Sequence, residues 1–158
     1  MDMLTANFDL QEARLSDLSA MREMEKVCFP LDEWPLIEQI GVLVLPAIVR
    51  IKAVYDGRMV GFVGGDVRRN KGEGWIMTLS VLPAYQRRGI ADALLEACEQ
   101  QMGMPVVKLS VRVSNYGAQA LYTKRGYKRQ EVWPHYYEGG EDGLVLKKDL
   151  PQFYRPDK

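Results

Sequence analysis

The sequence has few of the side chains that cross-link a fold or bind a metal ion. Two cysteines, Cys28 and Cys98, and a single histidine, His135, are spread over 158 residues. Their spacing matches neither a disulfide framework nor a paired zinc-ligand motif. We therefore expect no disulfide and no metal ion, and a protein of the reducing cytoplasm.

Long apolar runs and an excess charge of either sign are also absent. No stretch approaches about 18 consecutive apolar residues, and the opening MDMLTANFDLQEARLSDL is polar where a signal peptide is apolar. The 21 basic residues balance the 21 acidic ones, and RRNK at 68–71 is a single basic turn. The sequence predicts a soluble, unprocessed protein with neither a membrane nor a nucleic-acid partner.

The residues that are present fit one α/β domain over 1–158, because this length allows a single core. Asp56-Gly57 predicts a tight hairpin turn. Apolar periodicity predicts helices at 18–28, 34–45, 86–101 and 116–125, the first capped by Ser16 or Asp17 and the last by Ser114 or Asn115. It predicts strands at 8–14, 49–55, 58–67, 75–81, 106–113, 127–132 and 143–148. This order predicts a mixed sheet with helices on its faces.

The segment VLPAYQRRGIADALLEACEQ at 81–100 places two arginines and a glycine where a helix is expected to begin. The first N–H groups of a helix have no partners within it, and the helix dipole makes this end positive, so it attracts anions. Gly89 allows close approach of the backbone, and Arg87 and Arg88 add charge-assisted hydrogen bonds. The pattern favours a phosphate-bearing ligand over the alternative, a solvated arginine-rich first turn.

These residues resemble the acetyl-coenzyme A motif of the GNAT superfamily of N-acetyltransferases, which here runs from Gln86 through Gly89 to Ala91. The segments LSVRVSNYGAQALYTKRGYKR, CFP and HYYEGGEDGLVLKK extend the resemblance over nearly the whole chain. It is similar to the branch that acetylates protein N-termini, such as ribosomal-protein alanine N-acetyltransferases. The resemblance implies acetyl-CoA as co-substrate and a GNAT-like fold, a mixed, mainly antiparallel sheet flanked by helices on both faces.

The resemblance also implies a role for each matching residue. Tyr122 corresponds to the general acid that protonates the leaving thiolate of coenzyme A, although the residues alone favour packing on the buried face of a short helix. Asn115 would hydrogen-bond the pantetheine, and the Val81 N–H would stabilise the oxyanion. The other expected donor-binding residues are Leu79 and Ser80, along the pantetheine arm, and Arg87, Arg88, Gly89, Ile90, Ala91 and Asp92, whose amides would hold the pyrophosphate.

Two positions depart from the family pattern. Ser110 stands where ribosomal-protein N-acetyltransferases carry a glutamate and some eukaryotic relatives a histidine, and Trp75 where some relatives have a catalytic tyrosine. A serine hydroxyl can at most hold a water that relays a proton. Glu73, His135 and Glu138 remain candidates for a distant base acting through water.

With only a serine at the position of the base, the enzyme is expected to use an acceptor amine that is already partly neutral. An α-amine with a pKa of about 7.8 is about one-seventh neutral at pH 7, whereas a lysine amine of pKa about 10.4 is neutral about once in 2,500 molecules. We therefore expect the acceptor to be a protein or peptide N-terminus. The resemblance implies that Phe29, Pro30 and Leu31, together with Tyr136 and Tyr137, contact its first residues. For Phe29 to Leu31, packing at the end of a helix is an equal alternative.

Two other functions stay open. A small amine, such as a polyamine, would be favoured by acidic groove residues, and none is evident near the expected site. An acyl-CoA-binding sensor with weak or no catalysis would account for Ser110 and Trp75.

Overall fold

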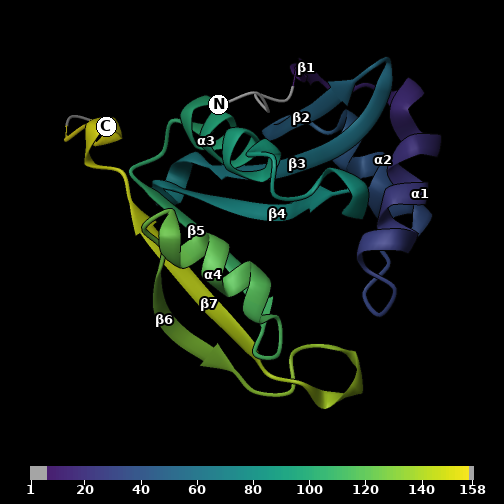
Figure 1. The fold of residues 1–158 in the computed structure, drawn as a ribbon. Helices are drawn as coiled ribbons and strands as arrows, with labels where there is room; N and C mark the ends of the chain where they lie inside the picture. Colours follow the sequence, from purple (N-terminus) through teal and green to yellow (C-terminus); the bar gives the residue numbers. More distant parts are fainter. Residues whose placement is uncertain (1–6, 157–158) are drawn as a thin grey trace, which may run out of the picture.

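One mixed sheet runs through residues 7–156, the part of the chain that the computed structural model describes (Figure 1). Residues 1–6, part of the segment that argues against a signal peptide, lie outside this range. The described strands are β1 (Asp9–Glu12), β2 (Ile48–Tyr55), β3 (Arg58–Arg68), β4 (Glu73–Val81), β5 (Val106–Arg112), β6 (Lys128–Trp133) and β7 (Gly143–Asp149), in the order β1-β2-β3-β4-β5-β7-β6.

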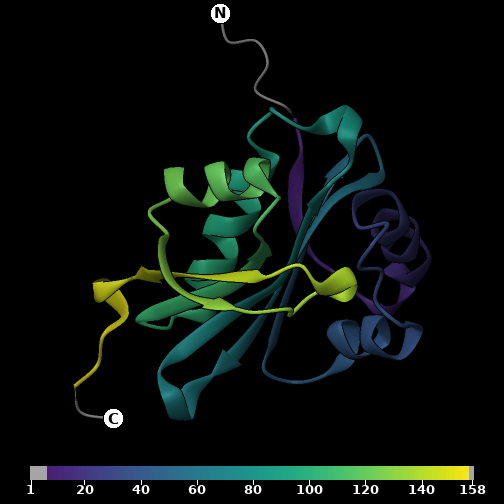
Figure 2. The same ribbon diagram turned by 90° about the horizontal axis from the view of Figure 1, so that it is seen from below.

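Helices cover both faces of the sheet, as Figure 2 shows. The pair α1 (Leu18–Cys28) and α2 (Leu36–Val44) lies on one face, and α3 (Ile90–Met102) and α4 (Tyr116–Lys124) lie on the other. The contact between β4 and β5 is parallel, and the remaining strand pairs are antiparallel. This confirms the expected fold class, including the antiparallel meander of β2, β3 and β4.

The core forms where the apolar periodicity places it. Val107 and Leu109 of β5 are buried, as are Leu94, Leu95 and Cys98 of α3, because each faces the other layer. Glycines in the sheet let α3 pack closely. A Cβ added at Gly65 or Gly74 would lie 2.7 Å from the Met102 sulfur, nearer than packed atoms approach.

Several element ends differ from the predicted ones. Helix α3 begins at Ile90, four residues later than expected, because Arg87 (φ 64°) and Gly89 (φ 82°) adopt left-handed conformations that a helix excludes. Strand β4 begins earlier, at Glu73, and β1 is shorter than predicted. Asp17 directly precedes α1, but its side chain accepts hydrogen bonds from the Arg14 N–H and from Lys52 instead of capping α1.

A carboxyl group is buried in α1. Glu25 is 3% exposed, and within residues 7–156 its Oε2 has no hydrogen-bond partner. Burial raises the pKa of this group to about 7. An unfolded glutamate has a pKa of about 4.3, so the unfolded chain loses this proton at a lower pH than the folded protein does.

Stability should therefore fall between about pH 4.3 and 7, by roughly 4 kcal/mol in total. We expect Glu25→Gln, which resembles the protonated carboxyl, to gain stability over the wild type at pH 8 and much less at pH 5. Urea unfolding of both proteins at the two pH values measures this. An equal difference at both would show that Glu25 is already charged in the folded protein at pH 5 and that its pKa is not raised.

Candidate active site

The two central strands separate and open the sheet. Strand β4 pairs with β5 only through Glu73, Gly74 and Trp75, so residues 76–81 and 109–112 diverge like the arms of a V (Figure 1). Within the described part of the chain, the β4 edge that faces β5 here has no partner strand. Its N–H and C=O groups are therefore available to a ligand lying in the opening, except the Val81 carbonyl, which accepts a hydrogen bond from the Gln86 side chain.

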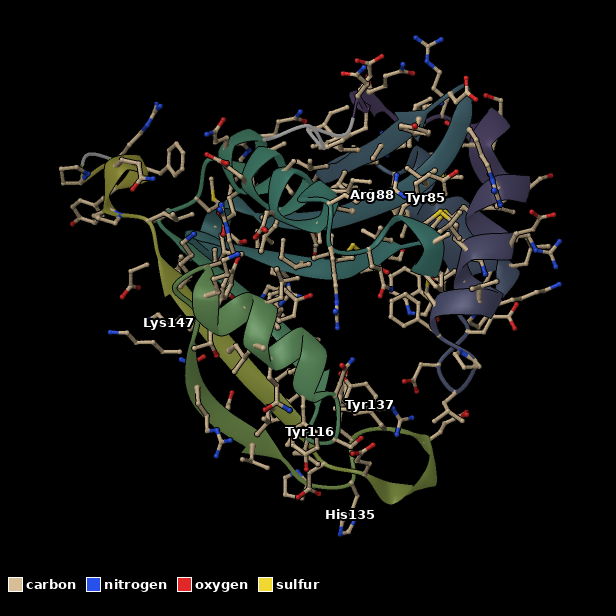
Figure 3. All side chains as sticks on the ribbon, in the orientation of Figure 1. Tyr85, Arg88, Tyr116, His135, Tyr137 and Lys147 are labelled. Carbon is tan, nitrogen blue, oxygen red and sulfur yellow. The ribbon has the colours of Figure 1, made fainter. Side chains whose placement is uncertain are left out.

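A groove of about 640 Å³ leads from this opening to the start of α3. It brings together nine of the ten residues expected to bind the donor: Leu79, Ser80, Val81, Arg87, Gly89, Ile90, Ala91, Asp92 and Asn115. The tenth, Arg88, is absent from the lining, and its guanidinium lies 5.2 Å from the ring centre of Tyr85, which does line the groove (Figure 3). We call this the donor groove.

The loop at the head of α3 has the features of an anion site. Gly89 is the N-cap residue and has no side chain to cap the helix, so the first N–H groups of α3 stay free for a ligand. The Gln86 side chain donates to the Val81 carbonyl (3.2 Å), which ties the loop to β4. Because Arg87 and Arg88 precede the helix, they add positive charge without occupying its first turn. These features fit a pyrophosphate.

A second hollow of about 260 Å³ adjoins the donor groove. Its lining comes from β4, β5, α4, the α1–α2 loop (29–35) and the β6–β7 loop (134–142), and includes Ser110, Tyr136 and Tyr137. The two spaces share Phe29, Leu79, Asn115, Ala118 and Tyr122, so they are continuous. We call the second space the acceptor pocket.

Tyr122 lies at the junction of the two spaces. It projects from α4, is 8% exposed, and packs edge-on against the ring of Tyr127 at 5.6 Å. Burial raises the pKa of its phenol well above the usual value of about 10. The group therefore keeps its proton at neutral pH, as its predicted role of general acid requires.

Asn115 is oriented by the helix that follows it. Its Oδ1 accepts a hydrogen bond from the Ala118 N–H at 3.1 Å and so caps α4. This bond turns the Nδ2 donor away from the helix, and the residue lines both the donor groove and the acceptor pocket. Capping and the predicted contact with pantetheine are therefore compatible.

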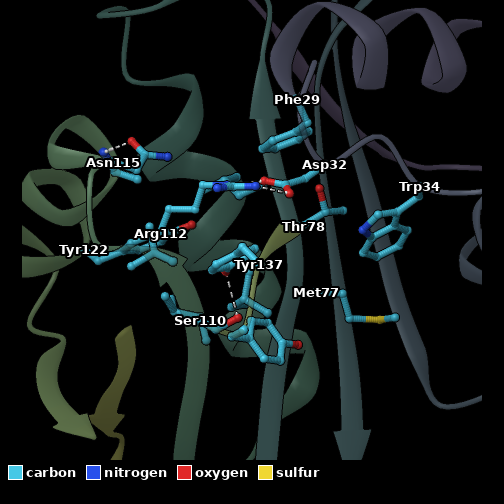
Figure 4. Close-up of a pocket in the computed structure, with 16 residues that line it drawn as sticks. Phe29, Asp32, Trp34, Met77, Thr78, Ser110, Arg112, Asn115, Tyr122 and Tyr137 are labelled. Carbon is cyan, nitrogen blue, oxygen red and sulfur yellow. Dashed lines mark hydrogen bonds and ion pairs between the residues drawn. The ribbon is translucent and has the colours of Figure 1, made fainter. Parts of the chain in front are cut away.

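The acceptor pocket contains a pair of hydroxyl groups at the place where the resemblance implied a base. Ser110 Oγ lies 3.1 Å from the Tyr137 hydroxyl (Figure 4). Trp75 lies outside the pocket lining; it stacks on Trp133 at 5.8 Å and donates to Glu73 at 3.1 Å.

The three candidate distant bases also lie outside the lining of this pocket. Burial favours the neutral form of Glu73, but hydrogen bonds from Trp75 and Lys108 outweigh it and hold its pKa below the usual value. His135 is exposed and points away from the pocket (Figure 3). Glu138 is also exposed, at the tip of the β6–β7 loop.

Sequence reasoning missed part of the pocket wall. Asp32, Trp34, Met77 and Arg112 line it, so the expectation of no acidic residue near the site is wrong. The Asp32 carboxylate is, however, paired with the Arg112 guanidinium at 2.6 and 2.7 Å (Figure 4). The alternation of β5 places Arg112 on the face of Ser110, which is the one signal that could have identified it.

Two of the predicted acceptor-binding residues lie outside the pocket. Phe29 lines it, whereas Pro30 and Leu31 are exposed and line neither space. Over residues 7–156, no helix is long and apolar enough to cross a membrane, and no group of three or more metal-ligating side chains occurs.

The family model described as Acetyltransferase (GNAT) family matches residues 18–127. The chain belongs to this family. It is 32% identical over 148 residues to the N-terminal acetyltransferase A complex catalytic subunit NAA10 of Arabidopsis thaliana, covering 89% of this chain and 77% of that protein. An N-alpha-acetyltransferase of Saccharolobus solfataricus is 28% identical over 158 residues, covering 91% and 94%.

Solved structures of GNAT proteins share the fold. The ribosomal-protein-S18-alanine N-acetyltransferase of Escherichia coli superimposes with a TM-score of 0.83 at 23% identity, over 96% of this chain and 98% of that one. Arabidopsis thaliana Naa50, in complex with the bisubstrate analogue CoA-Ac-MVNAL, gives 0.79 at 23% identity, over 90% and 99%. The protein is thus an acetyl-CoA-dependent N-acetyltransferase of the GNAT family, as the motif predicted.

Proposed function

We propose that this enzyme acetylates the N-terminal α-amine of a protein or peptide. The observation that carries the proposal is the chemistry of the acceptor pocket, whose described lining offers hydroxyl groups but neither an imidazole nor an unpaired carboxylate. Such a pocket can acetylate only an amine that is already substantially neutral. At pH 7 this favours α-amines over lysine side chains by a factor of several hundred.

The names of the relatives support the same acceptor. The similar proteins from Arabidopsis and Saccharolobus are N-terminal or N-alpha-acetyltransferases, and the analogue bound to Naa50 joins coenzyme A to the peptide MVNAL. The aromatic rings of Phe29, Tyr136 and Tyr137 give the pocket apolar walls suited to the first residues of a peptide.

The side chains divide the reaction between the two spaces. In the acceptor pocket, Ser110 and Tyr137 orient the amine, whose nitrogen forms a bond to the thioester carbon while the carbon–sulfur bond breaks. The Val81 N–H stabilises the oxyanion and Tyr122 gives its proton to the departing sulfur. The proton lost by the amine returns to Tyr122 through solvent, which completes the cycle.

Without an enzyme base, the pH dependence of kcat/KM should follow the acceptor. We expect an increase of about tenfold per pH unit below the α-amine pKa of about 7.8 and a plateau above it. No decrease is expected up to about pH 10, because burial raises the pKa of Tyr122. Profiles for two peptides whose α-amines differ in pKa test this. A midpoint that stays fixed would reveal a base on the enzyme.

The proposed function is tested by comparing acceptor classes. Short peptides that differ in the first residue, polyamines and free amino acids are each incubated with acetyl-CoA, and released thiol is measured. Preference for peptides supports the proposal. Preference for polyamines would assign Asp32 to amine recognition, and tight acetyl-CoA binding without turnover would favour the sensor.

A further inference from the structure

Arg112, at the C-terminal end of β5, lies between the two loops of the acceptor pocket. Its Nε and Nη2 donate to the Asp32 carboxylate in the α1–α2 loop at 2.7 and 2.6 Å. Its Nη1 donates to the Glu141 carboxylate (2.9 Å) and Nη2 also to the Glu138 carbonyl (3.2 Å), both in the β6–β7 loop. We infer that Arg112 is a positioning residue that fastens the two loops into one acceptor-binding surface.

The ion pairs of Arg112 with Asp32 and Glu141 are partly buried, and their geometry depends on the planar shape of the guanidinium. The side chains of Arg112, Asp32 and Glu141 are 12%, 29% and 24% exposed, so solvent screens their attraction less than on an open surface. Bidentate pairing with Asp32 uses one edge of the planar group and leaves Nη1 for Glu141. A lysine ammonium keeps the charge but cannot reproduce this fork.

The same guanidinium also orients the hydroxyl pair of the pocket. Its central carbon lies 4.8 Å from the ring centre of Tyr137, whose hydroxyl is 3.1 Å from Ser110 Oγ. The loops that Arg112 joins supply Phe29, Trp34 and Tyr137 to the pocket lining. Arg112 itself lines the acceptor pocket and is absent from the lining of the donor groove. Its loss should therefore impair acceptor binding and spare donor binding.

This inference rests on the proposed peptide acceptor. It is tested by measuring whether the loss of Arg112 weakens binding of the peptide but not binding of acetyl-CoA. We expect Arg112→Gln to raise KM for the peptide about tenfold or more, with kcat changed less than about threefold and the Kd for acetyl-CoA within about twofold. In Arg112→Lys the KM for the peptide should stay nearly as high as in Arg112→Gln. Asp32→Asn should also raise this KM, because it removes the partner of Arg112. In the double variant, Asp32→Asn with Arg112→Gln, the loss of binding free energy should be smaller than the sum of the two single losses.

The matched control is Lys52→Gln. It removes an ion pair with Asp17 at 2.9 Å whose side chains are 18% and 15% exposed, and neither residue lines the donor groove or the acceptor pocket. It should leave both substrate constants unchanged. Peptide KM within about twofold of the wild type in Arg112→Gln, or parallel weakening of acetyl-CoA binding, would overturn the inference.

Amide hydrogen exchange tests the role of Arg112 independently of the proposed function. Amides of residues 29–35 and 134–142 should exchange faster in Arg112→Gln than in the wild type, while those of 86–92 should not change. This result requires no turnover. If the wild type acetylates no peptide, the proposed function fails, and the exchange pattern still decides whether Arg112 joins the loops. Equal exchange of both loops in the two proteins would refute the joining.

Discussion

Tyr122→Phe is expected to lower kcat about 100-fold and to leave the Kd for acetyl-CoA within about twofold. The substitution removes the phenol proton from the junction of the two spaces and keeps the ring that packs against Tyr127. The departing sulfur then leaves as an unprotonated thiolate. Donors whose thiol is more acidic than that of coenzyme A need this proton less, so the loss should shrink with them. Steady-state kinetics with both kinds of donor measure the effect.

The matched control is Tyr127→Phe. This tyrosine is also buried, but its hydroxyl donates to Glu99 at 2.7 Å and it lines neither space. The Tyr127→Phe variant should lose about 2 kcal/mol of stability, because the hydrogen bond is to a carboxylate paired with Lys148, and should retain kcat. If Tyr122→Phe also retains kcat, the proton reaches the sulfur from another group, and Tyr122 belongs to the packing of α4.

Gly89→Asp should raise KM for acetyl-CoA about 30-fold. Aspartate tolerates a positive φ better than most residues, so little of this effect is backbone strain. Its charge, however, would stand at the head of α3 and would repel a diphosphate bound there, and a 30-fold increase corresponds to roughly 2 kcal/mol. Gly89→Asn has nearly the same shape without the charge and should cost only a few-fold. The gap between the two should narrow in high salt, because ions screen the repulsion.

Gly57→Asp is the control for the effect of placing an aspartate at a positive φ. Gly57 has φ 75°, against 82° at Gly89, and a Cβ added at either position meets no atom within 4 Å. Because Gly57 lies in the β2–β3 hairpin and lines neither space, its substitution should leave KM unchanged. Equal effects of Asp and Asn at position 89, insensitive to salt, would place the pyrophosphate elsewhere.

Most of the predicted donor-groove residues could be found from the sequence because they lie within the single segment 79–92. Val27, Cys28 and Leu121 also line the groove, but they come from distant segments and were not predicted. The motif from Gln86 to Asp92 carries its own geometry, and the strand before it can be recognised locally. The four-residue error at the start of α3 arises at Arg87, whose left-handed conformation no propensity anticipates. Residue type reveals that Gly89 can adopt such a conformation, but not that Arg87, two residues earlier, also does.

The acceptor pocket was less predictable, since it is assembled from distant segments. Asp32 and Arg112 are 80 positions apart, and their pairing depends on how the α1–α2 loop crosses the end of β5. Leu31 illustrates the same limit, because its apolar character suggested a contact, yet it is 68% exposed. Trp75 was identified as a departure from the family pattern, but only the stack with Trp133 shows where its ring lies.

The most direct measurement is the position of the acetyl group on a peptide that carries one free α-amine and one lysine. The enzyme and acetyl-CoA are incubated with this peptide at pH 7, and the modified residue is located by tandem mass spectrometry. The expected result is acetylation of the α-amine with the lysine unmodified, because a pocket without a base can use only the amine of lower pKa. Acetylation of the lysine side chain at a comparable rate would contradict both the proposed acceptor and the absence of an enzyme base.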